Sequence, residues 1–366
     1  MTSKILLSTL LFLYSAASVA EVTVRLLNAP EEGSLVLQVY DDPDAFGDFR
    51  NPAREERYSI QPDGSYRLSD LPAGQIVVLA YVDENDNGVL DRNFIGIPRE
   101  PMGLSNNYQP KGPPSFQRAA FYAANDQAIS LDIELYSVLG EFGQWGVGLG
   151  VIGRSSPYRG SDTNVTQVIP AITYFGERLQ WIGPELRYGI AGSDKLRLAV
   201  IAAYRLGAYE EDDSYVLEGL GDREDTLFGG IGLIYEAWNG FELDLQYTHD
   251  LLDRSGGGLA EVRLSRGFHL GNWRLVPRLG INWLSSELAN YDYGVPVSAA
   301  EPGRPAYEVG SSVTAEAGVG TIWELSEDWR MALNLAVERL DNDINNSPIV
   351  TDRQLLKGFI AVTYTL

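Results

Sequence analysis

The sequence predicts an all-β protein that consists of an N-terminal β-sandwich and a C-terminal antiparallel β-barrel crossing a membrane. Three observations support this prediction. Glycine usage changes near residue 138, because residues 21–137 hold only 8 of the 38 glycines. The second half alternates apolar and polar side chains over segments of about 10 residues, the length of a tilted membrane strand. After Ala20, no run approaches the roughly 18 apolar residues that a spanning helix needs.

Composition excludes several functional classes. The chain has 366 residues, with 28 basic and 50 acidic side chains and a net charge of −22. Nucleic acid is therefore an unsuitable partner, because phosphate recognition needs a basic surface. The chain contains no cysteine, so disulfides, thiolate metal sites and thiol nucleophiles are excluded.

Residues 1–20 are predicted to be a secretory signal peptide. Lys4 supplies the positive start, and an apolar stretch follows from Ile5 to Tyr14. Ser18 and Ala20 then stand at the −3 and −1 positions of a cleavage site. The alternative is an N-terminal membrane anchor, for which the stretch is short. The mature chain is thus expected to be exported.

Residues 21–137 contain seven β-compatible runs separated by turns rich in Pro, Gly and Asp. Seven short strands in about 115 residues suit a small antiparallel sandwich. The runs are Val22–Leu27, Ser34–Tyr40, Arg57–Ile60, Gly64–Leu68, Gln75–Asp83, Ala119–Ala123 and Ala128–Tyr136.

Residues 138–366 show the pattern of a membrane barrel. In the segment Phe241–Asp250, apolar side chains alternate strictly with Glu, Asp, Gln and Thr. An apolar face toward lipid and a polar face toward the lumen produce this alternation. Tryptophans stand near the ends of such segments, as in interfacial aromatic belts: Trp145, Trp181, Trp238, Trp273, Trp283, Trp323 and Trp329.

The number of barrel strands is predicted to be twelve, with ten as the alternative. Eleven periodic segments can be counted, whereas bacterial single-chain barrels have an even number of strands. They are 144–153, 164–175, 178–190, 195–208, 226–237, 240–251, 257–268, 272–284, 308–324, 328–340 and 354–366. Counted back from the C-terminus, long connections fall on one side and very short ones on the other, as expected of such barrels.

The C-terminal segment supports export to the outer membrane. Ile360, Val362, Tyr364 and Leu366 alternate with smaller or polar residues up to the end of the sequence. This pattern resembles the C-terminal signal of outer-membrane barrels, with Leu in place of the usual Phe.

Several short motifs of the second half resemble the MipA/OmpV family of outer-membrane proteins. In order, they are SPYRGSD (156–162), VIPAITY (168–174), YDYGVP (291–296), RPAYEVG (304–310) and SPIV (347–350). The resemblance covers residues 138–366 and implies an outer-membrane β-barrel. For some members it also implies a scaffold between a lytic transglycosylase and a murein synthase, and for others adhesion.

The first half resembles a separate, uncharacterised bacterial domain family. The stretches DENDNGVLDRNFIGIPREPMGLSNN (83–107) and GPPSFQRAAF (112–121) support this resemblance. It implies a transthyretin-like or immunoglobulin-like sandwich without known catalysis. Attachment to a barrel departs from the single-domain form of that family.

The segment from Asp83 to Asp91 is a candidate calcium loop. Asp83, Asn85 and Asn87 stand at alternate positions, followed by Gly88, and the Val89 carbonyl and the Asp91 carboxylate complete the first nine places of such a loop. The closing Glu is absent, because Phe94 occupies its position, so Asp86 or another loop would complete the shell. The alternative is a plain Asn-Gly turn between strands.

His249 and His269 are the two histidines, and His249 has Asp250 and Asp253 nearby but no distinctive Ser partner. His249 lies on the lipid-facing side of its segment, so an interfacial role is favoured over a catalytic one.

Residues 209–225 are strongly acidic. Cation bridging to lipopolysaccharide or a basic partner is possible there, and a solvated mobile loop is favoured.

Mixed charges on the lumen side of neighbouring segments are expected to pair across the interior and leave no wide pore. They are Glu242, Asp244, Asp250, Glu261, Arg263, Arg274, Arg278 and Glu338.

Together these features predict a non-catalytic scaffold of the outer membrane. The barrel would contact lipid and lipopolysaccharide, and the domain of residues 21–137 would lie in the periplasm beside murein-synthesis or lytic transglycosylase enzymes. Calcium is the one cofactor that the sequence suggests. The alternatives are a lipid-modifying hydrolase, a small-solute channel, or an adhesin that uses the long loops 209–225 and 285–307.

Overall fold

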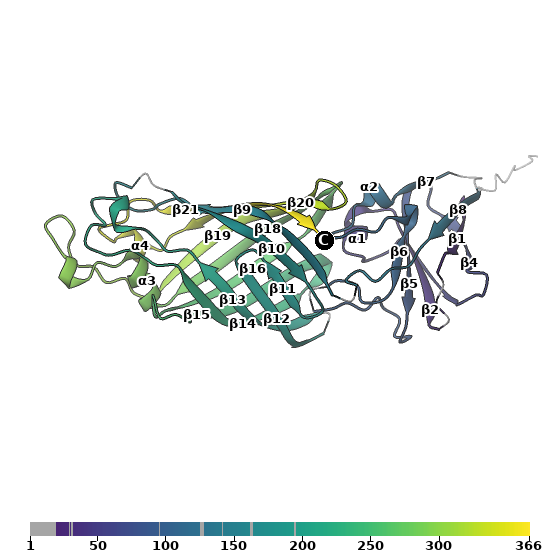
Figure 1. Ribbon diagram of the computed structural model, residues 1–366, viewed down its shortest axis with the longest axis horizontal. Coiled ribbons are helices and arrows are strands. Elements are labelled where there is room, and N and C mark those ends of the chain that lie inside the picture. Colours follow the sequence, from purple (N-terminus) through teal and green to yellow (C-terminus); the bar gives the residue numbers. More distant parts are fainter. Residues whose placement is uncertain are drawn as a thin grey trace, which may run out of the picture.

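A computed structural model describes residues 20–366, except 29, 31, 95, 125–127, 141, 162–163 and 194. The predicted signal peptide lies outside the described residues, apart from Ala20. Within the described part, an N-terminal unit (residues 20–137) and a barrel (residues 144–366) follow one another along the long axis (Figure 1). Among these residues there is no helix whose length and hydropathy would let it cross a membrane.

The barrel is a closed antiparallel sheet of twelve strands. It closes because β21 pairs with β9, with Ile360 opposite Val151, and β16 pairs with β18, with Val262 opposite Ile281. A three-residue strand, β17 (Phe268–Leu270), pairs with β18 alone. The wall strands are β9 (Gln144–Arg154), β10 (Val165–Phe175), β11 (Leu179–Ile182), β12 (Glu185–Gly192), β13 (Leu196–Arg205), β14 (Thr226–Glu236), β15 (Phe241–Asp250), β16 (Gly258–Arg266), β18 (Trp273–Leu284), β19 (Ser312–Glu324), β20 (Trp329–Arg339) and β21 (Gln354–Thr365).

The twelfth strand lies inside a segment that periodicity treats as one strand. Residues 178–190 form the hairpin β11–β12, with its turn at Gly183–Pro184. A Gly-Pro dipeptide is a strong turn signal. Gly183 has a positive φ of 55°, which suits glycine. Twelve strands are therefore confirmed, and ten is wrong.

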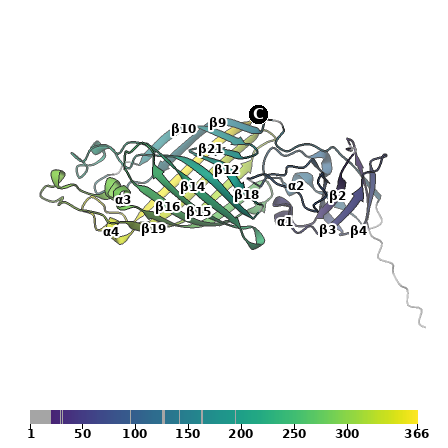
Figure 2. The same ribbon diagram turned by 90° about the horizontal axis from the view of Figure 1, so that it is seen from below.

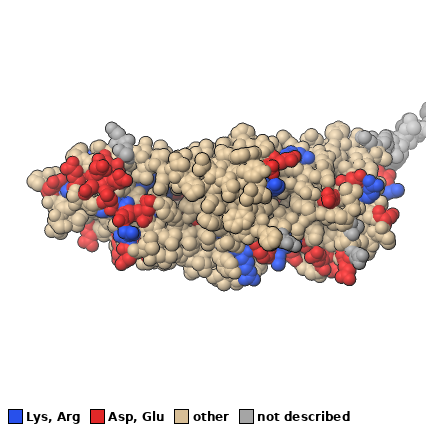
Figure 3. Space-filling model, in the orientation of Figure 1, with Lys and Arg blue, Asp and Glu red and all other residues tan. Residues whose placement is uncertain are grey.

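Side chains alternate between the outer surface and the lumen as predicted. Few charged side chains cover the middle of the barrel on the face in Figure 3, whereas acidic residues gather at the loop end. Two aromatic pairs mark the short-turn end. The Trp273 and Trp323 rings stack with centroids 4.6 Å apart, and the Trp329 ring lies 5.3 Å from that of Tyr364. The apolar exterior and the aromatic pairs match a lipid-facing wall.

The predicted pairing of charges inside the barrel is confirmed. Lys357 Nζ lies 3.1 Å from a Glu316 oxygen and 2.7 Å from a Glu338 oxygen. Further pairs join strands that are not neighbours, such as Arg187 with Asp244 and Arg197 with Glu242, each at 2.8 Å. Charges inside a barrel need such partners because little water surrounds them.

The long connections pack together into a cap over one end of the barrel. Loops 155–161, 206–225, 285–311 and 340–353 contribute to one apolar cluster, which also includes the loop ends of several strands. Short helices within these loops are η2 (Glu211–Asp213), α3 (Ser286–Tyr293), η4 (Val297–Ala299) and α4 (Asn342–Asn345). Tyr158 is central, since its ring contacts those of Tyr209 and Tyr293. The loop end is thus a packed structure.

The N-terminal unit consists of two small, open sheets. The first has the order β4-β1-β8, and the second has the order β3-β2-β5-β6, with β7 also paired to β5. Apolar residues of both sheets form one buried cluster. The strands are β1 (Ala20–Leu26), β2 (Ser34–Tyr40), β3 (Arg54–Ser59), β4 (Ser65–Leu71), β5 (Gly74–Asp83), β6 (Met102–Leu104), β7 (Phe121–Ala123) and β8 (Ala128–Ile133).

The expectation of a purely antiparallel arrangement in this unit is wrong. β8 pairs with β1 in the parallel direction, with Val24 opposite Leu131. A parallel pair needs a long crossover connection rather than a hairpin. The chain between β1 and β8 supplies one, because the whole second sheet and two helices lie within it.

A layer of short helices separates the second sheet from the barrel. It contains α1 (Pro43–Gly47), η1 (Ser105–Asn107) and α2 (Phe116–Ala119). Asp42 caps α1, because its carboxylate accepts hydrogen bonds from the Asp44 and Ala45 N–H groups at 2.7 and 3.1 Å. Phe46 then packs edge-on against Tyr40 and Phe116. β2 and β5 therefore have apolar neighbours on both faces, which explains their continuous apolar sequences.

The cap should depend on one ion pair with the wall. Asp292 of α3 is 1 % exposed, and its carboxylate lies 2.5 Å from Arg205 at the loop end of β13. Arg205→Met leaves this carboxylate buried without a cation and should lower the free energy of unfolding by about 3 kcal/mol. Urea unfolding in detergent micelles measures the change. Adding Asp292→Leu should restore much of it, since both partners are then apolar. An unchanged unfolding midpoint in the Arg205→Met variant would contradict this role.

Candidate functional site

The N-terminal unit sits on the end of the barrel that carries the short turns, as both views show (Figures 1 and 2). We call this contact the junction. It includes Asn93, whose amide donates to the Gly176 carbonyl at 3.0 Å, and Ser115, whose hydroxyl donates to Asn272 Oδ1 at 2.9 Å. It also includes the Asp44 carboxylate, which accepts from the His269 N–H at 2.8 Å. The unit therefore binds to several turns around the rim.

Charge complementarity holds much of the junction together. Four cations of the N-terminal unit face acidic residues of the barrel turns. The pairs are Arg50 with Glu236 at 2.7 Å, Arg99 with Glu177 at 3.0 Å, Lys111 with Asp328 at 2.8 Å, and Arg118 with Glu324 at 2.6 Å and Glu327 at 3.0 Å. One pair has the reverse polarity, since Asp48 lies 3.8 Å from Arg274. Such a pattern fixes orientation more than it adds affinity.

The Arg118–Glu324 pair is the most buried of these cation–acid contacts. The Glu324 side chain is 9 % exposed and also accepts a hydrogen bond from the Tyr108 hydroxyl at 3.2 Å. The Arg118 guanidinium lies over the Tyr108 ring, 4.6 Å from its centroid. These three side chains form one network that joins α2 to the end of β19.

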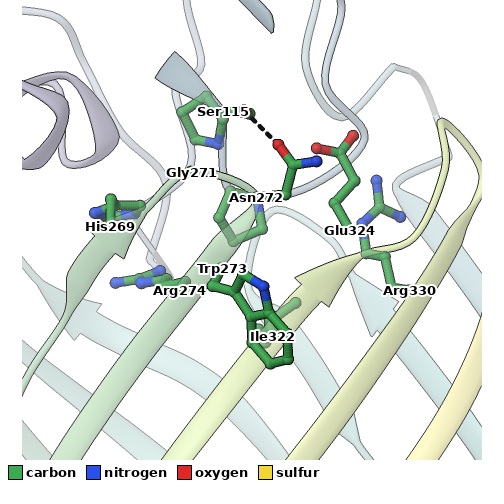
Figure 4. A pocket seen from close by; sticks show the side chains of 11 residues that line it. Ser115, His269, Gly271, Asn272, Trp273, Arg274, Ile322, Glu324 and Arg330 are labelled. Carbon is green, nitrogen blue, oxygen red and sulfur yellow. Dashed lines mark hydrogen bonds between the residues drawn. The ribbon is translucent and has the colours of Figure 1, made fainter. Parts of the chain in front are cut away.

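A small cavity lies beside this network (Figure 4). It encloses about 10 Å³, which is the space that one water molecule needs. Its lining combines the Ser115–Asn272 hydrogen bond with charged groups from two turns. The labelled lining residues include His269, Trp273, Arg274, Ile322, Glu324 and Arg330. The cavity is too small for an organic ligand, so it belongs to the packing of the junction.

His269 packs directly against α1. A Cβ at Gly47 would overlap the His269 ring, so only glycine fits there without a shift. The His269 side chain is buried, and both ring nitrogens lack a hydrogen-bond partner within the described part of the chain. Burial lowers the pKa of His269, and the nearby Arg274 guanidinium lowers it further. The neutral ring therefore serves as an apolar contact in the junction.

The segment around Phe94 enters the mouth of the barrel. The Phe94 ring fills the space where Gly189 has no side chain, and Arg197 donates to the Phe94 carbonyl at 3.1 Å. A cleft of about 290 Å³ opens next to it. Its lining includes Arg92, Arg99, Arg178 and Arg197, together with Asp91 and Glu177. The cleft lies between the N-terminal unit and the turns that follow β10 and β12.

The predicted calcium residues do come together, in the turn that follows β5. The Asn85 and Asn87 amides donate to the two oxygens of Asp91, at 2.7 and 2.9 Å. Asp83 accepts from the Asn87 and Gly88 N–H groups and pairs with Arg57 at 2.9 Å. Asn85 Oδ1 accepts from the Asn87 N–H. The turn is therefore closed by its own hydrogen bonds.

Glu100 approaches this turn from the following loop. Its carboxylate accepts from the Glu84 and Asp91 N–H groups at 3.2 and 3.0 Å. Burial, together with the nearby Asp91 and Asp83 carboxylates, raises the pKa of Glu100 to about 7. The described residues contain no cluster of three or more His, Asp or Glu side chains arranged to hold a metal.

The histidine on the barrel wall is not part of a catalytic arrangement in the described residues. His249 points outward from β15, and the Tyr247 hydroxyl lies 3.4 Å from its Nδ1. Asp250 points to the other side and accepts hydrogen bonds from Thr226 and Ser255. His249 and Asp250 therefore do not form an acid–base pair, although they are adjacent in sequence.

The acidic loop 209–225 is anchored, so the expectation of a mobile, merely solvated loop is wrong. Val216, Leu217 and Leu220 are buried in the cap. The Arg304 guanidinium donates to the Val216 and Glu218 carbonyls at 2.8 and 2.7 Å. The apolar residues within this acidic loop indicate that it packs against the cap, and the number of charges alone does not reveal this.

Comparison with known proteins identifies the barrel. Residues 147–366 match the family model described as MltA-interacting protein MipA. The chain belongs to the MipA family. Residues 22–130 match a second family model, an uncharacterised protein conserved in bacteria named DUF2141. This MipA-family chain therefore carries an additional N-terminal domain that has a family of its own.

Curated relatives place MipA-family proteins in the outer membrane. The outer membrane protein OmpV of Vibrio cholerae is 26 % identical over 64 % of this chain and 91 % of its own length. Omp26La of Vibrio anguillarum is 25 % identical over the same shares. The MltA-interacting protein of Escherichia coli K12 is 25 % identical over 56 % of this chain and 82 % of its own. With the closed barrel, these matches establish an outer-membrane protein.

Among solved structures, the outer membrane channel DcaP of Acinetobacter baumannii is similar over 95 % of this chain and 96 % of its own. The identity is 11 % and the TM-score is 0.26. The named relatives are outer-membrane or MltA-interacting proteins rather than enzymes.

The motifs that resemble the MipA family converge in the cap. Tyr158, Tyr293, Val309 and Val350 belong to four of those motifs and to the same apolar cluster. The stretches that resemble the N-terminal family supply much of the junction, including Phe94 and Arg118. The sequence could not reveal the junction, because its contacts join positions about 80 to 230 residues apart.

Gly47→Ala should loosen the junction, because a methyl group there overlaps His269. Overpacking typically costs about 1–3 kcal/mol, so the junction should open roughly tenfold more often. The chain has no cysteine, and Ser115 is 2 % exposed in the junction, so Ser115→Cys reports opening through its rate of thiol labelling. Adding His269→Ala should return the rate toward that of Ser115→Cys alone. Equal rates with and without Gly47→Ala would show that the two residues are not packed together.

Proposed function

We propose that this MipA-family protein is a non-catalytic scaffold that presents its N-terminal domain to a periplasmic partner at the outer membrane. The observation that supports this proposal most directly is the junction, in which four ion pairs and several hydrogen bonds connect the domain to the turns. Short turns of bacterial barrels face the periplasm. The domain of residues 21–137 would then lie in the periplasm, after removal of residues 1–20.

The partner class follows from the relatives. Proteins of Escherichia coli and Shigella flexneri with 25 % identity to this chain are named MltA-interacting proteins. We infer a murein-remodelling enzyme, a lytic transglycosylase or a murein synthase, as the partner. A domain that is fixed to the membrane by its docking would hold such an enzyme at a constant distance from the murein layer.

The barrel itself has features of a membrane anchor rather than of an open pore. Ion pairs cross the lumen, the cap packs over one end, and the N-terminal domain lies across the other. Wide aqueous channels are typical of barrels with 16–18 strands. These features support an anchoring role over the small-solute channel.

The first sheet is the face of the N-terminal domain farthest from the junction. Its solvent side is polar, with Arg25 paired to Asp132 and Arg67 paired to Glu21, both at 2.7 Å. The two sheets share one core, which supports a sandwich of transthyretin-like or immunoglobulin-like type. We infer that this outer sheet is the surface available to the partner.

Affinity capture from cross-linked envelopes tests the scaffold. The full chain should retain a transglycosylase or murein synthase, identified by mass spectrometry. Arg25→Glu with Arg67→Glu should reduce the yield several-fold, because both changes invert the charge of the outer sheet. Arg339→Glu, on the exposed loop end of β20, is the matched control and should leave the yield unchanged. Retention of neither enzyme by the unmodified chain would contradict the scaffold.

We further propose that Asp83, Asn85, Asn87, Val89 and Asp91 bind calcium, with Glu100 as the neighbouring carboxylate. The alternating oxygen groups support it. The Asn amides would have to turn their oxygens inward, because their nitrogens now donate to Asp91. Millimolar calcium should then raise the melting temperature of the full chain in detergent, and Asp91→Ala should abolish the rise. An unchanged melting temperature, together with a calorimetric titration that shows no heat of binding, would show that this segment is a turn that does not bind calcium.

A further inference from the structure

The barrel wall is incomplete beside β10. The ladder between β10 and β11 joins only Thr173–Phe175 to Gln180–Ile182, and one more bond runs from the Gly183 N–H to the Ile172 carbonyl at 3.1 Å. Residues 165–171 of β10 pair with β9 alone among the described strands. On the far side of the β11–β12 hairpin, the Tyr204 N–H of β13 bonds the Pro184 carbonyl at 2.9 Å. The short hairpin thus leaves a gap between β10 and β13, which we call the notch.

The sequence of β10 fits an unpaired edge. In an antiparallel strand, the N–H and C=O groups of every second residue point to the same neighbour. Ile172 bonds toward β11, so Thr166, Val168 and Pro170 direct their backbone groups into the notch. Proline has no N–H to donate and is confined to the edges of sheets. Pro170 therefore stands where the described strands provide no pairing partner.

Side chains, not backbone, bridge the notch. Gln167 lies on the lumen side of β10, since it pairs with Ile152, yet it is exposed. Tyr204 lies on the outer side of β13, and the two side chains are close enough to interact across the gap. A lumen residue can meet an outward residue only where no wall separates them. The Tyr204 hydroxyl also bonds the Asp225 carboxylate.

The lumen behind the notch is apolar, in contrast to the opposite side. Apart from Arg154 and Lys357 near the cap, the lumen-facing residues of β21, β9 and β10 carry no charge. Gly146, Gly148 and Gly150 leave this wall bare of side chains. Ile152, Ile169 and Phe359 face the lumen and are partly exposed. The Phe359 ring stands 3.6 Å from the position of a Cβ at Gly183, directly behind the hairpin turn.

We propose that the notch admits the acyl chain of an outer-leaflet lipid, which lies on Ile152, Ile169 and Phe359. The notch is continuous with the apolar exterior of an outer-membrane barrel, where Val168 and Pro170 are exposed on one side and Tyr204 on the other. Lipid tails are therefore the apolar groups that meet the opening. It lies toward the loop end of the wall, where Tyr204 marks an aromatic interface.

The polar edge of the notch can bind the groups that link the acyl chain to the rest of the same lipid. Unpaired N–H and C=O groups are costly in hydrocarbon, and the backbone of Thr166 and Val168 has such groups. Ester or amide groups at the top of an acyl chain can bond to them. One molecule then satisfies the backbone edge and the apolar lumen surface together.

Contact quenching tests this proposal in the full chain, which has no cysteine of its own. Phe359→Cys is labelled with bimane and placed in nanodiscs that contain phosphatidylcholine with a nitroxide on its acyl chain. We expect quenching close to that of Ile360→Cys, the outward neighbour on the same strand. Ala332→Cys faces the lumen behind strands paired on both sides and should be quenched several-fold less. Equal, weak quenching at positions 359 and 332 would overturn the proposal.

A second measurement closes the notch without touching the lumen surface. Gln167→Cys with Tyr204→Cys is bridged by a short bis-maleimide, and lipids retained after detergent extraction are counted by native mass spectrometry. Bridging should abolish the retained lipid. Val200→Cys with Ile231→Cys is the matched control, because these outward residues face each other across a paired ladder. Lipid retention that persists after bridging at 167 and 204, with bridging verified, would also overturn the proposal.

Discussion

The need to pair backbone N–H and C=O groups inside a bilayer governs this structure, and among the described wall strands it is left unmet along the edge of the notch. Lipid tails offer no hydrogen bonds, so a sheet can cross the membrane only when it closes on itself. The β21–β9 and β16–β18 ladders provide this closure. Because a closed sheet encloses a lumen, the polar side chains on the inner face of each strand need partners there. The pairs around Arg187, Arg197 and Lys357 satisfy that need.

The two ends of the barrel are covered by different kinds of interaction. The cap is mainly apolar, with tyrosines and aliphatic residues from four loops. The junction is mainly polar and depends on complementary charges such as Arg50–Glu236 and Arg118–Glu324. Salt screens exposed ion pairs but has little effect on apolar packing. The two ends should consequently respond differently to ionic strength, with the junction the more sensitive.

Local sequence patterns predicted the barrel well because each strand carries its own signal. The alternation in Phe241–Asp250 corresponds to a single strand, and the loop lengths sort correctly to the two ends. The even-number rule turns eleven periodic segments into twelve or ten strands, and the Gly183–Pro184 turn explains the twelfth strand. The parallel β1–β8 pair could not be predicted, because it depends on the path of a long connection. The junction could not be predicted from local sequence either, because Phe94 contributes to it only by packing against Gly189, which is distant in the chain.

The packing of the cap has a consequence for biogenesis. Its apolar cluster draws on the connection after β9 through Tyr158 and on the start of the final strand through Leu355. These positions are brought together only when the first and last strands of the sheet meet. In a partly inserted chain, these apolar loops would be separate from one another. Their buried side chains would then be exposed to water at the cell surface. Resistance of that region to added protease therefore reports the moment of ring completion, with no label on the transmembrane wall.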